Sequence, residues 1–141
     1  MIRNLKGIVK ANEEFNHVIN VMMKSKVFSD EHKAFVILKA CLKTLRDRIG
    51  KSEAIHLGSQ LSPILRGYYY EGWELNNTIS RAKSTDDFLN DVRRHFRGHD
   101  EIDLNKAVPI TLGIILDMID QGEARQVLQN LPTEIQEMCL E

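Results

Sequence analysis

Two pairs of residues in the sequence, one of Glu and His and one of two His, have spacings that could bind a metal ion. Glu53 and His56 stand three residues apart, which is half of a di-iron helical motif. The other half is missing, because a similar run seventy residues later carries Glu123 and Gln126, and an amide is a poor metal ligand. We therefore expect no metal and no cofactor, with Glu53 in the first turn of a helix and His56 on the surface.

His95 and His99 also have a ligand-like spacing of four residues. Gly98 and a capping Asp100 instead favour a turn between two helices, with both imidazoles solvated. The sequence has no Gly-x-Ser-x-Gly turn and no glycine-rich phosphate-binding loop. No catalytic residue is predicted, so an enzyme would need a site assembled from distant parts of the chain.

The most unusual segment is aromatic: four of the nine aromatic residues fall within residues 68–73. Leu61, Leu65, Tyr69 and Trp73 would share one stripe of a helix until Gly72 ends it. The rings either fill the junction between two parts of the core, as aromatic side chains commonly do, or wall a groove for a ligand or partner. The candidate binding residues of such a groove are Arg66, Tyr68, Tyr70, Glu71 and Trp73.

Helical periodicity is clearest between residues 30 and 49, where apolar residues recur every three or four positions after a capping Ser29 or Asp30. The positions of this helix that are not apolar should form a face in contact with solvent. Its basic residues are Lys39, Lys43 and Arg46.

Capping residues and prolines indicate where other helices begin. We expect helices after Asn12, at Ser52 and at Pro63, and later after Ser84 and at Pro132.

The pattern of residues 30–61 returns seventy residues later, with eight of 32 positions identical, against roughly one in sixteen expected by chance. We predict an all-α fold of two tandem pseudo-repeated four-helix units, residues 1–73 and 85–141, joined by a connector over residues 74–84. Units of this size bury little core alone, so they should pack as one globular helical domain.

The second unit carries one apolar face that the first lacks, formed by Ile110, Ile114 and Met118. The first unit has Ala40, Thr44 and Arg48 at the same positions. This face is either buried between the units or contacts another protein chain, most simply a second copy. Pro109 should kink the helix that carries it.

The net charge of -1 hides an uneven distribution. Residues 1–70 hold 12 Lys and Arg against 6 Asp and Glu, a charge of +6, and residues 71–141 hold 7 against 14, a charge of -7. An anionic partner is conceivable for the basic half, but no nucleic-acid-binding motif accompanies it, so binding to nucleic acid is not expected.

The chain shows no signs of export or membrane insertion. Its N-terminal apolar residues are too interrupted for a secretory signal, and the apolar stretch 108–116 is too short to span a bilayer. Cys41 and Cys139 suggest neither a disulfide framework nor a metal site. We expect a cytoplasmic protein with two reduced thiols and no membrane partner.

The aromatic segment and its neighbours resemble a known family. The block Leu65-Arg-Gly-Tyr-Tyr-Tyr-Glu-Gly-Trp73 is similar to the signature of an uncharacterised bacterial family, domain of unknown function 2267. Supporting matches are Leu45–Ile49, Ser52–Ala54, Gly122–Ala124 and Asn130–Pro132. The resemblance covers about residues 12–140, implies an all-helical fold with a doubled unit, and implies no activity.

These observations favour a non-enzymatic helical interaction or scaffold module, whose partner is an unknown protein or another copy of the chain. One alternative is a small-ligand-binding protein that uses the Tyr68–Trp73 region. The other is an enzyme whose site is not visible in linear motifs.

Overall fold

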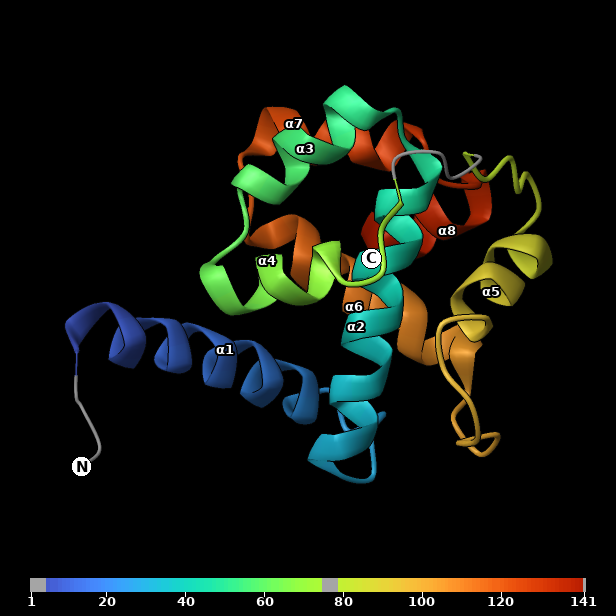
Figure 1. Ribbon diagram of the computed structural model, residues 1–141. Coiled ribbons are helices and arrows are strands. Elements are labelled where there is room, and N and C mark those ends of the chain that lie inside the picture. Colours follow the sequence, from blue (N-terminus) through green and yellow to red (C-terminus); the bar gives the residue numbers. More distant parts are fainter. Residues whose placement is uncertain (1–4, 75–78, 141) are drawn as a thin grey trace.

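The computed structural model describes residues 5–74 and 79–140, and all regular structure within them is helical (Figure 1). The helices are α1 (Lys6–Lys24), α2 (Glu31–Arg48), α3 (Lys51–Ser59), α4 (Pro63–Tyr70), α5 (Thr85–Arg93), α6 (Leu104–Asp117), α7 (Gln121–Gln129) and α8 (Thr133–Leu140). The predicted all-α class is confirmed. Within this part of the chain, no helix combines the length and the apolar character needed to cross a membrane.

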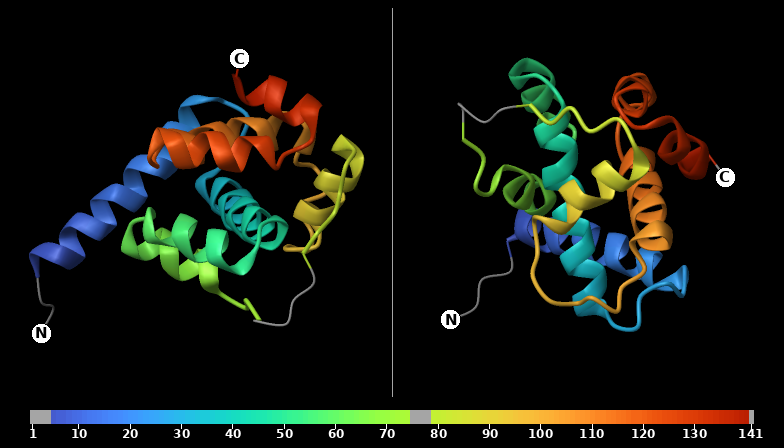
Figure 2. Two further views of the ribbon diagram at one scale, coloured as in Figure 1. Left: turned by 90° about the horizontal axis from the view of Figure 1, so that it is seen from above. Right: turned by 90° about the vertical axis from the view of Figure 1, so that its right-hand side faces the viewer.

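Helix α2 occupies the centre of the fold, where it packs against α1, α3, α4, α5 and α6 (Figures 1 and 2). Asp30 caps it as predicted, since its carboxylate accepts a hydrogen bond from the Lys33 backbone N–H at 2.8 Å. Because neighbours surround the helix, the predicted solvated basic face is wrong. Arg46 is only 3% exposed, and Lys39 and Lys43 are half-buried.

Arg46 is buried because it completes the end of α4. One guanidinium nitrogen donates to the backbone carbonyls of Tyr69, at 3.0 Å, and Glu71, at 2.8 Å. The other two nitrogens donate to the carboxylate of Asp47, at 2.8 and 3.3 Å. The last carbonyls of a helix lack partners within it and form the negative end of its dipole. The guanidinium therefore supplies both hydrogen bonds and a positive charge where α4 needs them.

One hydrophobic core runs through both halves of the chain. It includes Leu42 and Leu45 of α2 and Leu112 and Ile115 of α6, all nearly inaccessible to solvent. Helix α6 also packs against α1, α7 and α8. The chain is thus a globular helical domain, as predicted. The internal repeat and the unit boundaries stay predictions, and residues 75–78 of the proposed connector lie outside the described residues.

The start of α1 differs from the prediction. The helix begins at Lys6 rather than after Asn12, and Leu5, at the N-cap, makes no side-chain hydrogen bond. Buried residues further along, including Val18 and Met22, anchor this helix, so its first turns form without a capping side chain.

The other predicted starts agree more closely with the structure. Pro63 is the first residue of α4, and Ser84 caps α5 by accepting a hydrogen bond from the Asp87 backbone N–H at 3.1 Å. Helix α3 begins one residue before Ser52. Pro109 lies inside α6, where its ring nitrogen has no hydrogen to donate to the preceding turn.

The buried guanidinium leads to a first prediction. Replacing Arg46 by Met should lower the free energy of unfolding by about 3 kcal/mol, because the α4 carbonyls and Asp47 lose their partner. Urea unfolding at neutral pH measures this loss.

Lys43→Met is the matched control, because Lys43 is also on α2 and pairs with Glu71 at 2.8 Å, but the Glu71 side chain is 58% exposed and this ion pair is open to solvent on one side. It should change stability by no more than about 0.5 kcal/mol. Equal losses for the two variants would contradict the role assigned to Arg46.

Candidate functional site

The aromatic block fixes α4 against α3. Tyr69 is fully buried, and its hydroxyl donates to the Ala54 backbone carbonyl at 2.7 Å. Burial raises the pKa of this phenol. The Tyr70 hydroxyl donates to the Ile55 carbonyl at 3.3 Å and lies so close to Gly58 that a Cβ there would collide with it. Glycine at position 58 is therefore required by the approach of α4.

The structure separates the aromatic residues that one of the two alternatives placed in a single groove. The Tyr70 ring lies 5.0 Å from the Tyr69 ring and 5.7 Å from that of Trp73, beside α3. Tyr68 instead lies 5.1 Å from Phe35 of α2. Residues two apart on a helix point in nearly opposite directions, so Tyr68 cannot share a wall with Tyr70.

The predicted polar contacts, Arg66 and Glu71, both bond within the chain. Arg66 donates to the carbonyls of Gly58, at 3.0 Å, and Leu61, at 2.8 Å, and so closes the end of α3. The Glu71 carboxylate accepts a hydrogen bond from Lys43, whose charge holds the pKa of Glu71 below its usual value. These two side chains hold helices in place.

Tyr68 lines a groove of about 450 Å³ between α1, the start of α2 and α4. Its aromatic side chains pack edge to face, with ring centroids 5.5 Å apart for Phe15 and Phe35 and 5.1 Å for Phe35 and Tyr68. The Lys39 ammonium lies 4.2 Å from the Phe35 ring centroid. We call this surface the α1–α4 groove. Its principal lining residues are Asn12, Phe15, Ile19, Phe35, Ile64 and Tyr68.

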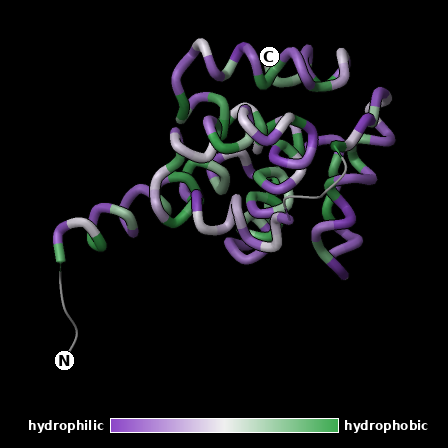
Figure 3. The backbone as a smooth tube through the Cα atoms, turned by 45° about the horizontal axis from the view of Figure 1, so that its top comes forward, coloured by the Kyte–Doolittle hydropathy of each residue, from purple (hydrophilic) through white to green (hydrophobic). Residues whose placement is uncertain are grey.

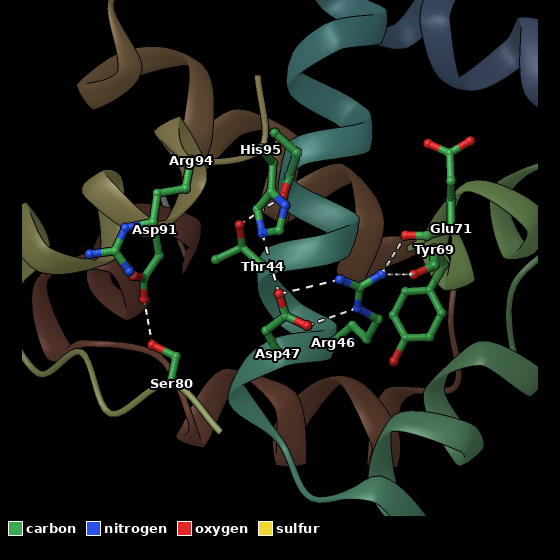
Figure 4. Close-up of polar contacts among 10 residues, drawn as sticks. Thr44, Arg46, Asp47, Tyr69, Glu71, Ser80, Asp91, Arg94 and His95 are labelled. Carbon is green, nitrogen blue, oxygen red and sulfur yellow. Dashed lines mark hydrogen bonds and ion pairs between the residues drawn. The ribbon is translucent and has the colours of Figure 1, made fainter. Parts of the chain in front are cut away.

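A second, more polar cavity of about 650 Å³ lies between α2, α5 and residues 79–82. Asp47 and His95 meet there, with His95 Nε2 3.3 Å from Asp47 Oδ2 (Figure 4). Burial alone would raise the pKa of Asp47, but hydrogen bonds from His95 and Arg46 and their charges hold it below its usual value. The Asp47 carboxylate, which His95 Nε2 contacts, orients the imidazole ring.

The other polar groups of the cavity form a separate cluster. Asp91 accepts hydrogen bonds from the Ser80 hydroxyl and, at 2.9 Å, from Arg94 (Figure 4). Because the Ser80 hydroxyl is directed to Asp91, it does not complete a Ser–His–Asp triad with His95. The lining of the cavity therefore contains two separate polar groups, Asp47 with His95 and Asp91 with Ser80 and Arg94.

The polar cavity corrects one prediction and could not have been found from linear motifs. Gly98 and His99 adopt positive φ angles of 72° and 58°, so the predicted turn is confirmed, but Asp103 rather than the predicted Asp100 caps the next helix, α6. The His95 and His99 side chains, however, are only 21% and 26% exposed and not solvated as expected. Asp47 and His95 lie 48 residues apart, and no spacing rule connects them.

The remaining titratable pairs do not form a metal site. His56 lies 3.2 Å from Glu123, which joins α3 to α7, and His99 lies 3.8 Å from Glu101. Among the described residues, no three His, Cys, Asp or Glu side chains are grouped so that they could hold one metal ion.

The predicted partner face is partly covered. Ile110, Ile114 and Met118 are all half-buried, and Ile114 and Met118 pack against the core. Large apolar side chains are more exposed at the start of α1, where Leu5 and Ile8 are each 59% exposed. The sequence prediction missed this surface because it placed the helix start after Asn12. The spacing of Leu5 and Ile8 with later apolar residues could have revealed it.

Comparison with known proteins identifies one family, whose description names no activity. A family model described as "Uncharacterized conserved protein (DUF2267)" matches residues 15–138. No match was found among curated proteins.

The Asp47–His95 pair leads to a prediction about pH. The pKa of Asp47 is lower in the folded protein than in the unfolded chain. The ionised carboxylate therefore stabilises the folded state at pH values above the unfolded pKa, and this stabilisation is lost as the pH falls through the folded pKa. Stability should therefore decline below about pH 4. Asp47→Asn should remove about 1–3 kcal/mol at pH 7 and flatten this decline. Urea unfolding from pH 7 to pH 3 measures both effects.

The exposed Asp117, at the end of α6, provides the control. Asp117→Asn should leave the pH profile close to that of the wild type. A profile for Asp47→Asn as steep as the wild-type one would show that another group causes the acid sensitivity.

Proposed function

The chain belongs to the DUF2267 family of uncharacterized conserved proteins, and we propose that it is a non-enzymatic protein-interaction module that uses helix α1 as its contact surface. The family description assigns no activity, and the exposed surface of the molecule is what supports this function.

The observation that carries the proposal is the projecting first half of α1. Residues 5–10 are all exposed and extend beyond the rest of the molecule (Figures 1 and 3). This segment presents Leu5 and Ile8, each 59% exposed, and Val9, 39% exposed. We call residues 5–10 the α1 arm. Apolar side chains grouped on an exposed helix favour contact with another apolar surface over contact with water.

The other exposed apolar side chains are distributed differently. Ile55, Ile79 and Met138 are 40–53% exposed, but they lie on three separate parts of the chain. Single exposed apolar residues are common in soluble proteins and need no partner. The grouping on the α1 arm is what supports an interaction surface there.

This proposal predicts that one substitution on the arm removes partner binding. Immobilised wild-type protein should retain partner proteins, which include any further copies of the chain, from a lysate of its native cells. The Ile8→Asp variant should retain about tenfold less of each partner, which corresponds to a loss of about 1.4 kcal/mol in binding free energy. Mass spectrometry of the retained proteins measures this.

Ile55→Asp is the matched control, because Ile55 is 53% exposed on α3, far along the chain from the arm. It should retain what the wild type retains. If all three proteins retain the same set, or nothing specifically, the proposed function is wrong.

The polar cavity supports a second candidate function, the binding of a small polar molecule. Its walls carry positive and negative side chains: Arg94 pairs with Asp91, and Asp47 contacts and orients His95. An enzyme that uses His95 as a general base is the extension of this alternative. The ligand class that fits such mixed charges is a zwitterion such as a free amino acid.

A thermal-shift panel of free amino acids tests this second candidate. A binding amino acid should raise the melting temperature at a concentration well above its Kd. The shift should vanish in His95→Gln and persist in His17→Gln, an exposed histidine on α1. A panel without any shift, or a shift unaffected by His95→Gln, would reject this candidate.

We also propose a cytoplasmic location and a duplicated origin of the two halves. The two free thiols, one buried and one half-buried, support the location because cysteines stay reduced in the cytoplasm. The equal lengths of α3 and α7, nine residues each, and of α4 and α8, eight residues each, support the duplication.

A further inference from the structure

We propose that a third cavity, between α1, the start of α4 and the end of α6, binds a short apolar peptide whose two ends are free. The carboxylate of the peptide lies at the first turn of α4, its ammonium lies at α1, and its side chains cover the apolar floor. The cavity does not include the α1 arm, so the inference goes beyond the proposed function and does not depend on it.

The size and the floor of this cavity suit an apolar ligand. Its volume of about 630 Å³ lies within the range of about 300–1,000 Å³ that is typical of small-molecule sites. Val18, Leu61 and Leu65 line it and are 3%, 3% and 2% exposed, so they form an apolar floor. Met118, at the end of α6, adds a half-buried side chain whose flexibility lets it adapt to a ligand. Covering these side chains releases water from apolar surface.

The first turn of α4 supplies hydrogen-bond donors at one side of the cavity. In α5 and α7 the N-cap side chain accepts a hydrogen bond from the backbone N–H three residues later. Ser62, the N-cap of α4, makes no such bond. Within the described part of the chain, the Leu65 N–H therefore has no acceptor. A helix start with such an N–H favours an anion, because the positive end of the helix dipole lies there.

The Ser62 hydroxyl is a second, independent feature of the same wall. Ser62 lines the cavity, and its hydroxyl oxygen is buried without a hydrogen-bond partner among the described residues. Buried polar groups nearly always have a partner, since an unpaired one costs free energy. A ligand carboxylate at the start of α4 would accept hydrogen bonds from both the Ser62 hydroxyl and the Leu65 N–H.

The α1 side of the cavity carries the opposite charge. Glu13 and Glu14 line it there, and Glu14 is 3.9 Å from the Lys10 ammonium. Arg66 lines the cavity from α4, where it donates to the Gly58 and Leu61 carbonyls. Among the described residues, no ion pair joins Arg66 to either glutamate across the cavity. The α1 side therefore favours a cation, and the α4 side favours an anion.

This separation of charges distinguishes a peptide from a free amino acid. A free amino acid carries its ammonium and its carboxylate on one carbon atom, so it cannot place them on two sides of an apolar floor. Each residue of an extended chain adds about 3.3–3.6 Å between the two ends. A dipeptide such as Leu-Leu thus carries separated charged ends and two apolar side chains between them.

Isothermal titration calorimetry with Leu-Leu tests the proposal on the full chain. The wild type should bind Leu-Leu with a Kd below about 1 mM. N-acetyl-Leu-Leu lacks the ammonium and Leu-Leu amide lacks the carboxylate, so each should bind about tenfold more weakly. Free leucine should bind about tenfold more weakly as well. No heat of binding with Leu-Leu, or equal affinity for the capped peptides, would overturn the proposal.

Ser62→Ala separates ligand binding from a structural role. The Ser62 hydroxyl makes no hydrogen bond within the described chain, so its loss should leave the melting temperature unchanged or raise it. The affinity for Leu-Leu should nevertheless fall about tenfold. Glu14→Gln should cause a similar loss of affinity, because it removes a charge that faces the ammonium.

Two variants serve as controls. Glu137→Gln alters an exposed glutamate on α8, and Ile8→Asp alters the α1 arm, so both should bind Leu-Leu as the wild type does. Because Ile8→Asp tests the proposed function, failure of either proposal leaves the other intact. Unchanged affinity in both Ser62→Ala and Glu14→Gln would show that Leu-Leu binds elsewhere and would overturn the site.

Discussion

The buried guanidinium of Arg46 connects the two sides of the molecule. On one side it binds the last carbonyls of α4, and on the other it holds Asp47, which in turn contacts His95 after α5. A buried charge is tolerated only when its hydrogen bonds are nearly all made, so these partners must keep their places together. The position of α4 determines where Tyr68 lines the α1–α4 groove, and the position of Asp47 determines the polar cavity.

Local sequence signals predicted the helices well where the deciding contacts are local. Asp30, Pro63 and Ser84 act within one turn of their own helix, and each marks a helix start that the structure confirms. Arg46 could not be predicted in the same way. An arginine on the polar side of a helix usually points to solvent, and only the helices packed around α2 bury this one.

The candidate sites depend on contacts between distant residues, and their prediction was less complete. Composition identified the aromatic block, but the turn of α4 separates Tyr68 from Tyr70 and Trp73. Asp47 lies on α2 and His95 follows the end of α5, and no motif connects them. The α1 arm was missed for a local reason, because Asn12 has the side chain of a helix cap but lies inside the helix.

The contact between Gly58 and Tyr70 has a consequence for how relatives of this chain can vary. A Cβ at position 58 would also lie 2.6 Å from Tyr70 Cζ, so loss of the hydroxyl alone would not make room for it. Position 58 can gain a side chain only if position 70 becomes smaller or its ring turns away. The two positions form one steric unit, and their substitutions should covary during evolution.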